Sequence, residues 1–214
     1  MQAMAKAPTV TTEQVKALRE QTGAGIMECQ RALQEAGGKL EEAVKLLRAK
    51  GARLAGEKAS RETRQGLIGS YVHGGKIGVL VEVNCETDFV ARTDAFKNFV
   101  HEICLQIASM NPRCIRREDV PPEEIGDALE HLHEEIQGVD DEAAQPMQQA
   151  HMEQFYKERV LLDQPYVKDV SKTIQDLLHE TVTSTRENIV IHRFVRFVLG
   201  EESPSLGPPT NASS

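Results

Sequence analysis

The chain has 214 residues, of which 40% are hydrophobic and 27% are charged, and its formal net charge is −8 at pH 7. No apolar stretch approaches the roughly 18 residues of a membrane-spanning helix, so we expect no membrane partner. A nucleic-acid binder needs a basic surface to displace counterions, and the acidic balance argues against that class. The first residues, Met1 to Lys6, lead into no apolar segment, so we expect a cytoplasmic protein without a secretory signal.

The charge is unevenly distributed along the chain. Residues 1–65 carry 12 Lys and Arg against 8 Asp and Glu, whereas residues 118–163 carry 2 against 14. This division is typical of a protein that docks onto another protein through separate patches, although a solvated acidic helical face would give the same counts.

The cysteines and histidines do not form a catalytic or metal-binding pattern. Cys85 and the other three cysteines are widely spaced and include no Cys-x-x-Cys pair, so we expect free thiols. Structural zinc sites need closer ligand spacings. His131 and His133 lie two residues apart, on different sides of a helix. We therefore predict no cofactor, no metal and no catalytic residue.

The first predicted module, residues 1–51, is a bundle of three short helices. Thr11-x-x-Gln14 matches a capping box, and the helix that follows should end at Gly23. A second helix should run from Gly25 to the Gly-Gly pair at 37–38. The third carries apolar residues at i, i+3, i+4 and i+7 from Leu40, and we expect it to end at Gly51.

A basic, partly helical linker is predicted over residues 52–65, followed by a core over residues 66–200. Two β-type runs, Leu67–Val72 and Ile77–Val83, flank a glycine-rich turn and predict a hairpin. Asp94–Met110 has its apolar residues at helical spacing and should pack on that hairpin.

The second half of the core alternates between helical and extended patterns. We predict an acidic helix from Pro121-Pro122 to about Ile136, then a helix that Pro146 starts or interrupts. Leu161–Lys168 should be an extended connector.

Ser171 can cap a further helix from Lys172 to about Thr183. Asn188–Leu199 should be a strand with Arg193 and Arg196 directed outward. The fold class is α+β: a helical bundle, then a mainly antiparallel sheet covered by helices. Residues 201–214 are rich in Ser and Pro and should form a disordered tail.

The segment Asn84–Arg92 between the second strand and its helix is short and polar but contains Phe89. Two interpretations stand. Asp88 or Asp94 caps the helix while Phe89 packs in the core, or the Thr87-Asp88-Phe89 tripeptide presents an apolar side chain to a partner.

This tripeptide and the N-terminal segment Leu18–Cys29 resemble elongation factor Ts, including its Thr-Asp-Phe loop and its ubiquitin-associated-like N-terminal module. The Thr-Gly-Ala-Gly turn before Ile26-Met27 is the specific element of that module. From about Val10 to Gly200 the order of elements is similar to a short form of the family, with further similarity at Leu161–Asp169 and Glu187–Phe194.

The resemblance implies a guanine nucleotide exchange factor for the translational GTPase elongation factor Tu, and not an enzyme. In this family the exchange is a coupling between two binding sites. Arg19, Ile26 and Met27 would grip the GTPase domain. Four loop residues would bind it and dislodge its Mg²⁺, with the aromatic side chain as wedge and the aspartate supporting the loop; these are Thr87, Asp88, Phe89 and Val90.

Long members of the family carry two copies of the core, so the resemblance implies that this single-copy chain forms a homodimer and that the core of residues 66–200 is its dimerisation domain. The late strand has no cysteine, which makes any dimer non-covalent. A monomer would result instead if the acidic helices of residues 123–160 folded back over the sheet.

Two other functions stay open at this point. The chain could be a non-exchanging binding module, in which the bundle recognises a ubiquitin-like or ribosomal partner. It could also be a thiol enzyme that uses Cys85, although no base can be placed beside that thiol.

Overall fold

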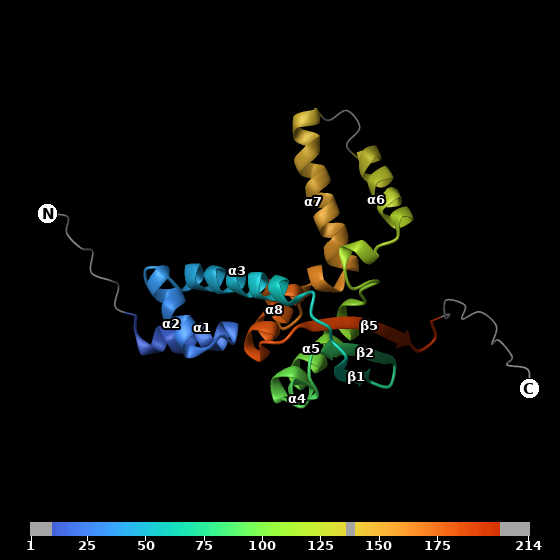
Figure 1. Ribbon diagram of the computed structural model, residues 1–214. Coiled ribbons are helices and arrows are strands. Elements are labelled where there is room, and N and C mark those ends of the chain that lie inside the picture. The colour runs from blue at the N-terminus through green and yellow to red at the C-terminus, as the bar shows by residue number, and fades with distance from the viewer. Residues whose placement is uncertain (1–9, 136–139, 202–214) are drawn as a thin grey trace, which may run out of the picture.

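The computed structural model describes residues 10–135 and 140–201, in which a bundle of three helices precedes a core of sheet and helices (Figure 1). The bundle helices are α1 (Thr12–Thr22), α2 (Ile26–Glu35) and α3 (Leu40–Lys58). Thr11 and Gln14 close the predicted capping box, and Gly23 ends α1 in the left-handed conformation, with φ 64°. The bundle encloses a core of its own, which includes Leu18, Cys29, Leu33, Ala43 and Val44.

The third helix was predicted to end at Gly51, but α3 continues to Lys58. Gly51 is buried where α3 crosses α8 (Ile174–Thr185), and a Cβ added to it would lie 3.3 Å from the Thr183 hydroxyl oxygen. The glycine therefore allows the two helices to approach closely and does not stop the helix. Half of the predicted linker is helical and lies against the core. The predicted division into domains stays a prediction.

Three antiparallel strands form the core sheet: β1 (Gln65–His73), β2 (Ile77–Cys85) and β5 (Ile189–Val198), in the order β1-β2-β5. The predicted hairpin joins β1 and β2, and Gly74 and Gly75 at its turn both have positive φ. The predicted α+β class is confirmed.

One face of the sheet is covered by α5 (Asp94–Met110). Alternate residues of β2 point toward this helix and are buried together with the apolar stripe of α5: Val79, Val81, Val83, Phe96, Val100, Ile103 and Ile107. Helix α8 adds Ile174 and Val182 to the same core. The apolar spacing predicted for both elements is therefore the spacing of the core.

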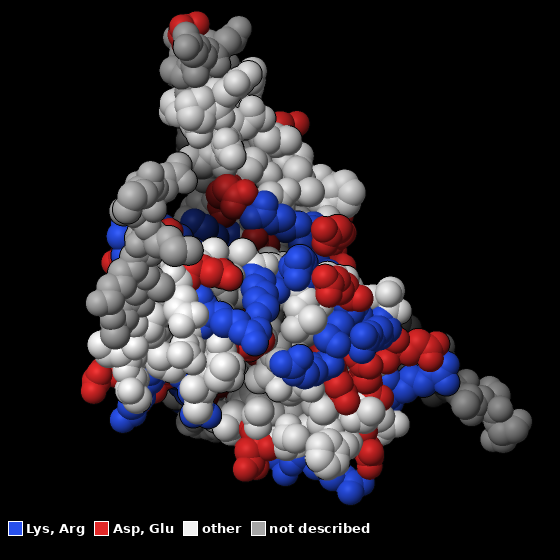
Figure 2. Space-filling view, turned by 60° about the vertical axis from the view of Figure 1, so that its left-hand side comes forward, with Lys and Arg blue, Asp and Glu red and all other residues white. Residues whose placement is uncertain are grey.

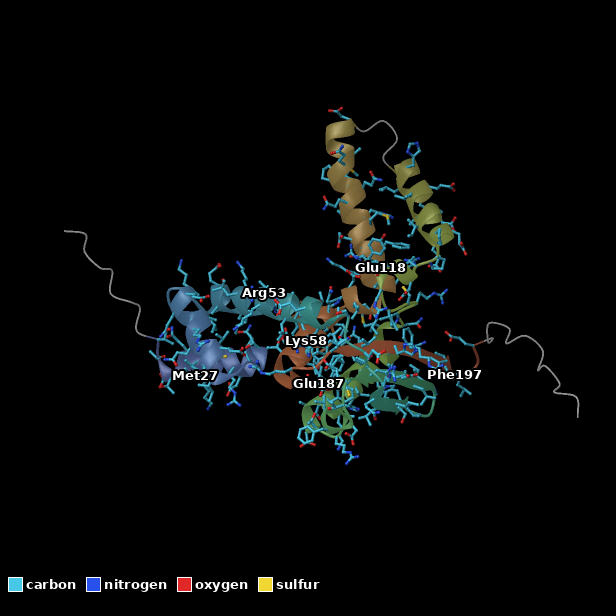
Figure 3. All side chains as sticks on the ribbon, viewed as in Figure 1. Met27, Arg53, Lys58, Glu118, Glu187 and Phe197 are labelled. Carbon is cyan, nitrogen blue, oxygen red and sulfur yellow. The ribbon has the colours of Figure 1, made fainter. Side chains whose placement is uncertain are left out.

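The opposite face of the sheet, called here the outer sheet face, is exposed and apolar. Five side chains from the three strands are 39 to 71% exposed on it: Ile68, Val72, Leu80, Val195 and Phe197. Figure 3 labels Phe197 at the far end of β5. Arg193 lies among them and donates from Nε to a carboxylate oxygen of Glu82 at 2.7 Å, and this hydrogen bond lowers the pKa of that carboxyl.

Arg196 was predicted to point outward, and this prediction is wrong. It stands opposite Val79, a residue of the buried face, and its guanidinium donates to the carbonyl of Ala108 near the end of α5 at 3.4 Å. Register decides this, because residues paired across a sheet share a face.

Helices α6 (Pro122–Glu135) and α7 (Asp141–Arg159) project from the core as a hairpin, at the top of Figure 1. They leave the outer sheet face exposed, so the alternative in which they fold back over it is wrong. Pro146 lies inside α7, and the predicted helix end at Ile136 falls outside the described residues. Arg117 fixes the base of the hairpin, with two hydrogen bonds of 2.9 Å to the Glu153 carboxylate.

The connector after α7 is less extended than predicted. It contains a turn of 3-10 helix, Leu161–Asp163, before the short strands β3 (Pro165–Tyr166) and β4 (Asp169–Thr173). Ser171 lies in β4, and the cap of α8 is Thr173, which forms a capping box with Asp176.

The strand predicted over Asn188–Leu199 is present as β5, and the predicted tail after Glu201 lies outside the described residues. No helix within residues 10–135 and 140–201 is long and apolar enough to cross a membrane.

Candidate functional site

The Thr-Asp-Phe segment forms a one-turn helix, α4 (Asp88–Ala91), between the end of β2 and the start of α5. Thr87 caps it and accepts the Val90 N–H at 3.3 Å. Thr93 caps α5 in the same way, accepting the Phe96 N–H at 3.3 Å. The predicted aspartate caps are therefore wrong, because a threonine precedes each aspartate and occupies the capping position.

Phe89 is 77% exposed, so the interpretation that places it in the core is wrong. Successive residues of a helical turn point about 100° apart, and the next two, Val90 and Ala91, are buried in the core cluster. Val90, which was also predicted to contact the partner, is only 6% exposed and packs beneath the turn, and its contact with a partner stays a prediction. The turn thus presents one aromatic side chain outward from a buried base.

Asp88 supports the turn weakly. Its carboxylate pairs with Arg92 one turn later, 2.7 Å from the guanidinium, and both side chains are mostly exposed. Exposed pairs of this kind contribute well under about 1 kcal/mol.

A residue that the sequence did not identify holds the start of the loop. One carboxylate oxygen of Glu187 accepts the N–H groups of Glu86 and Thr87 at 3.1 and 3.0 Å, and the other accepts the Thr87 hydroxyl at 2.6 Å. Figure 3 labels Glu187 between α8 and α4. Its separation from the loop by 100 residues leaves no periodic signal, and only its place in the segment Glu187–Phe194 could have pointed to it.

Cys85, the candidate nucleophile, is buried at the end of β2 and donates from Sγ to the carbonyl of Thr87 at 3.2 Å. Burial, followed by the nearby Glu187 charge, raises the pKa of the thiol to about 11. A nucleophilic cysteine needs a lowered pKa, so the thiol here is structural.

The other predicted contact residues lie at the corner between α1 and α2. Arg19 is in the last turn of α1 and is exposed, while Ile26 and Met27 open α2 and are 56% and 60% exposed. Figure 3 shows Met27 at the lower edge of the bundle, and in Figure 1 α4 lies at the lower edge of the core. The structure therefore brings the three bundle residues together and holds the Phe89 turn separately on the core.

In Figure 2, Lys and Arg side chains lie mixed with Asp and Glu side chains across the middle of the face, so neither sign of charge dominates there. Two basic residues of the bundle and linker pair with acidic residues of the core: Arg48 with Asp176 at 3.9 Å, and Arg61 with Glu86 at 3.5 Å. The excess of positive charge in residues 1–65 is thus partly neutralised.

The exposed apolar side chains of Phe89 and of the pair Ile26 and Met27 are typical of a class of protein that works by binding another protein. The family model described as elongation factor TS matches residues 1–201. An elongation factor Ts from Thermoanaerobacter sp. (strain X514) is 51% identical over 195 residues, covering 90% of this chain and 96% of the relative. One from Coprothermobacter proteolyticus is 52% identical over 90% of this chain and 99% of the relative.

The chain therefore belongs to the elongation factor Ts family. It is a translation factor that exchanges the nucleotide of elongation factor Tu, and it is not an enzyme, as the resemblance predicted.

Proposed function

We propose that the chain speeds GDP release by inserting Phe89 between helices of the GTPase domain of elongation factor Tu, which displaces the Mg²⁺ of that GTPase. The observation that carries the proposal is an aromatic side chain that is 77% exposed on a turn anchored from below. Burying a Phe is worth about 1.5–3 kcal/mol, and about 1.4 kcal/mol corresponds to a tenfold change in affinity. One insertion can thus offset a tenfold to hundredfold weakening of nucleotide contacts.

The mechanism is linkage between two ligands of one GTPase. If the factor binds the nucleotide-free form more tightly than the GDP form, GDP must weaken the factor by the same ratio. The ion and the phosphates carry much of the nucleotide affinity, so displacing Mg²⁺ is an effective way to weaken GDP. Thr87 and Asp88 shape the loop in this proposal, and Val90 anchors it.

Arg19, Ile26 and Met27 supply a second contact on the same GTPase domain. The two apolar side chains are more than half exposed on the first turn of α2. A second contact turns insertion of the loop into an intramolecular step with a high effective concentration. We expect the bundle to control affinity and the loop to control the rate of release.

The active form is proposed to be a non-covalent homodimer in the cytoplasm. Support comes from the outer sheet face, because monomers rarely expose contiguous apolar patches of this kind. A symmetric contact would bury Leu80, Val195 and Phe197 of both copies, and two-fold dimers are the commonest soluble oligomers.

The test is the release of a fluorescent GDP from elongation factor Tu, measured by stopped flow with increasing amounts of this protein. We expect saturable acceleration, and we expect Phe89→Ala to lower the maximum rate strongly. Val170→Ala is the matched control, because Val170 is also exposed, at 80%, but lies on β4. A protein that binds the GTPase without speeding release would instead be the non-exchanging binding module.

A further inference from the structure

We propose that Glu187 and Asn188, at the corner between α8 and β5, are positioning residues for the exchange reaction. They hold the Phe89 turn in place and join it to the end of α3, which carries the bundle. The proposal rests on the function proposed above, in which the turn and the bundle contact the same GTPase domain.

The Glu187 carboxylate accepts hydrogen bonds from the part of the loop that lies between the end of β2 and the start of α4. The N–H groups of Glu86 and Thr87 both point to one of its oxygens, at 3.1 and 3.0 Å. The other oxygen accepts the Thr87 hydroxyl at 2.6 Å, and that hydroxyl oxygen in turn accepts the Val90 N–H as the cap of α4. The carboxylate therefore orients the capping group itself, through charge-assisted hydrogen bonds.

Glu86, a residue of the loop, in turn accepts a hydrogen bond from the corner between α8 and β5. Its carboxylate accepts the Asn188 N–H at 2.6 Å and lies 3.5 Å from the Arg61 guanidinium. The buried Asn188 amide donates to the carbonyls of Arg61 and Ala59, at 2.8 and 3.4 Å. Ala59 is the C-cap of α3, so one corner of the chain bonds to both the loop and the helix that carries the bundle.

The turn needs such support because it is too short to hold its own shape. Four residues form at most one helical turn, which is unfavourable in isolation. Burial of Val90 and Ala91 makes Phe89 point outward, but apolar contacts are not directional and leave the tilt of the turn free. The hydrogen bonds that Glu187 accepts fix this tilt.

A first experiment uses amide hydrogen exchange on the full chain without a partner. The Glu86 and Thr87 amides should be protected in the parent and lose that protection in Glu187→Ala, while the β2 amides of Val81 and Val83 keep theirs. Unchanged protection of the two loop amides would show that the carboxylate does not hold the loop.

Glu102→Ala is the matched control for these measurements. The Glu102 carboxylate accepts from the Tyr166 hydroxyl and the Lys168 ammonium, both at 2.6 Å, on α5 and away from the loop. This variant loses a comparable network but should leave the loop amides protected and the exchange activity intact.

The second experiment measures the release of fluorescent GDP from elongation factor Tu. Glu187→Ala should lower the maximum rate by about tenfold or more, because small misplacements of a working group are costly. The concentration at half-saturation should change less, since the bundle contact is intact. Asn188→Ala should act in the same direction.

The double variant with Phe89→Ala separates positioning from direct contact. If Glu187 acts through Phe89, its replacement should change the rate by less than about twofold once the aromatic ring is absent. Effects that multiply in full would mean that Glu187 contacts the GTPase directly, and positioning would be wrong.

The two proposals fail in different ways. A parent chain that does not speed GDP release refutes the proposed function, while the amide measurement still decides whether Glu187 holds the loop. A fully active Glu187→Ala refutes the positioning role and leaves the proposed function standing.

Discussion

The Phe89 turn and the outer sheet face are both apolar and exposed, but they are built in opposite ways. The turn presents a single ring from a one-turn helix whose neighbouring side chains are buried beneath it. The outer sheet face presents five side chains from three strands, spread over a broad surface. A projecting ring suits insertion into another protein, whereas a broad flat face suits a matching flat face.

The two surfaces also differ in what supports them. The sheet is held by two antiparallel ladders of backbone hydrogen bonds, with one shift of register between Glu82 and Val83, and by α5 behind it. The turn depends on a few directed hydrogen bonds that the loop donates to the carboxylate of Glu187, a residue distant in sequence. Exposed apolar residues therefore report a function only together with the structure that carries them.

The largest expected contrast is between two phenylalanines seven residues apart. Phe96 is fully buried, and Phe96→Ala should lower the free energy of unfolding by about 3–5 kcal/mol. Phe89→Ala should change it by less than about 0.5 kcal/mol and still reduce the maximum rate of GDP release by about tenfold or more. Urea denaturation measures the first quantity and stopped flow the second. Strong destabilisation by Phe89→Ala would show that the ring is structural.

The outer sheet face is tested by adding a charge at its centre. Leu80→Asp should convert a dimer into a species near the 23.7 kDa chain mass in sedimentation equilibrium, because a buried charge without a partner is costly. Val170→Asp, on another exposed strand, should leave the dimer intact. A parent chain that sediments as a monomer at micromolar concentration contradicts the dimer, and one that dissociates only on adding reductant contradicts its non-covalent character.

Met27→Ala should separate the bundle from the turn. Loss of a partly exposed contact residue should raise the concentration at half-saturation by about tenfold or less, with the maximum rate of GDP release unchanged. Arg53→Ala is the control, because Arg53 is exposed on another bundle helix, α3. A lower maximum rate with unchanged half-saturation would assign Met27 to the release step.

The smallest effect is a pH dependence at the joint between α3 and α8, away from both surfaces. Burial lowers the pKa of His179 below its ordinary 6.5, although Asp176 opposes the shift. The folded chain therefore binds this proton less readily than the unfolded chain, so stability should fall as the pH drops below about 6.5. His179→Gln should remove part of this loss in thermal unfolding followed between about pH 7.5 and pH 5.

Other charged groups lie at the joint, so the pH dependence of the parent must be compared with that of His179→Gln to isolate the contribution of His179. Burial raises the pKa of the neighbouring Glu180, and Arg48 lies 3.9 Å from Asp176. Glu180 acts in the opposite direction: its raised pKa makes the folded chain lose stability as the pH rises above 4.5, the ordinary pKa of this carboxyl. A slope unchanged in His179→Gln would mean that His179 contributes nothing to the pH dependence.

Local patterns predicted the elements whose signals are local. The capping box at Thr11 and Gln14, the glycine turn between β1 and β2 and the apolar stripe of α5 all depend on residues within a few positions of each other. Ser171 was the wrong cap because Thr173 has the stronger pattern, an acceptor followed three residues later by Asp176.

Local patterns gave wrong predictions where the position of a residue depends on a segment that is distant in the sequence. Gly51 reads as a helix stop, but in the folded chain it is the contact point with α8, where a larger side chain would meet Thr183. Arg196 reads as an outward side chain, but its register with Val79 places it on the buried face.

The sequence by itself determined the order of helices and strands and the presence of Phe89 in a polar loop, because both are carried by neighbouring residues. Only the tertiary structure decided that the ring points outward, since that depends on burying Val90 and Ala91 in the core. It alone also brought Glu187 to the loop across 100 residues, because β5 must pair with β2 before the carboxylate can reach those amides.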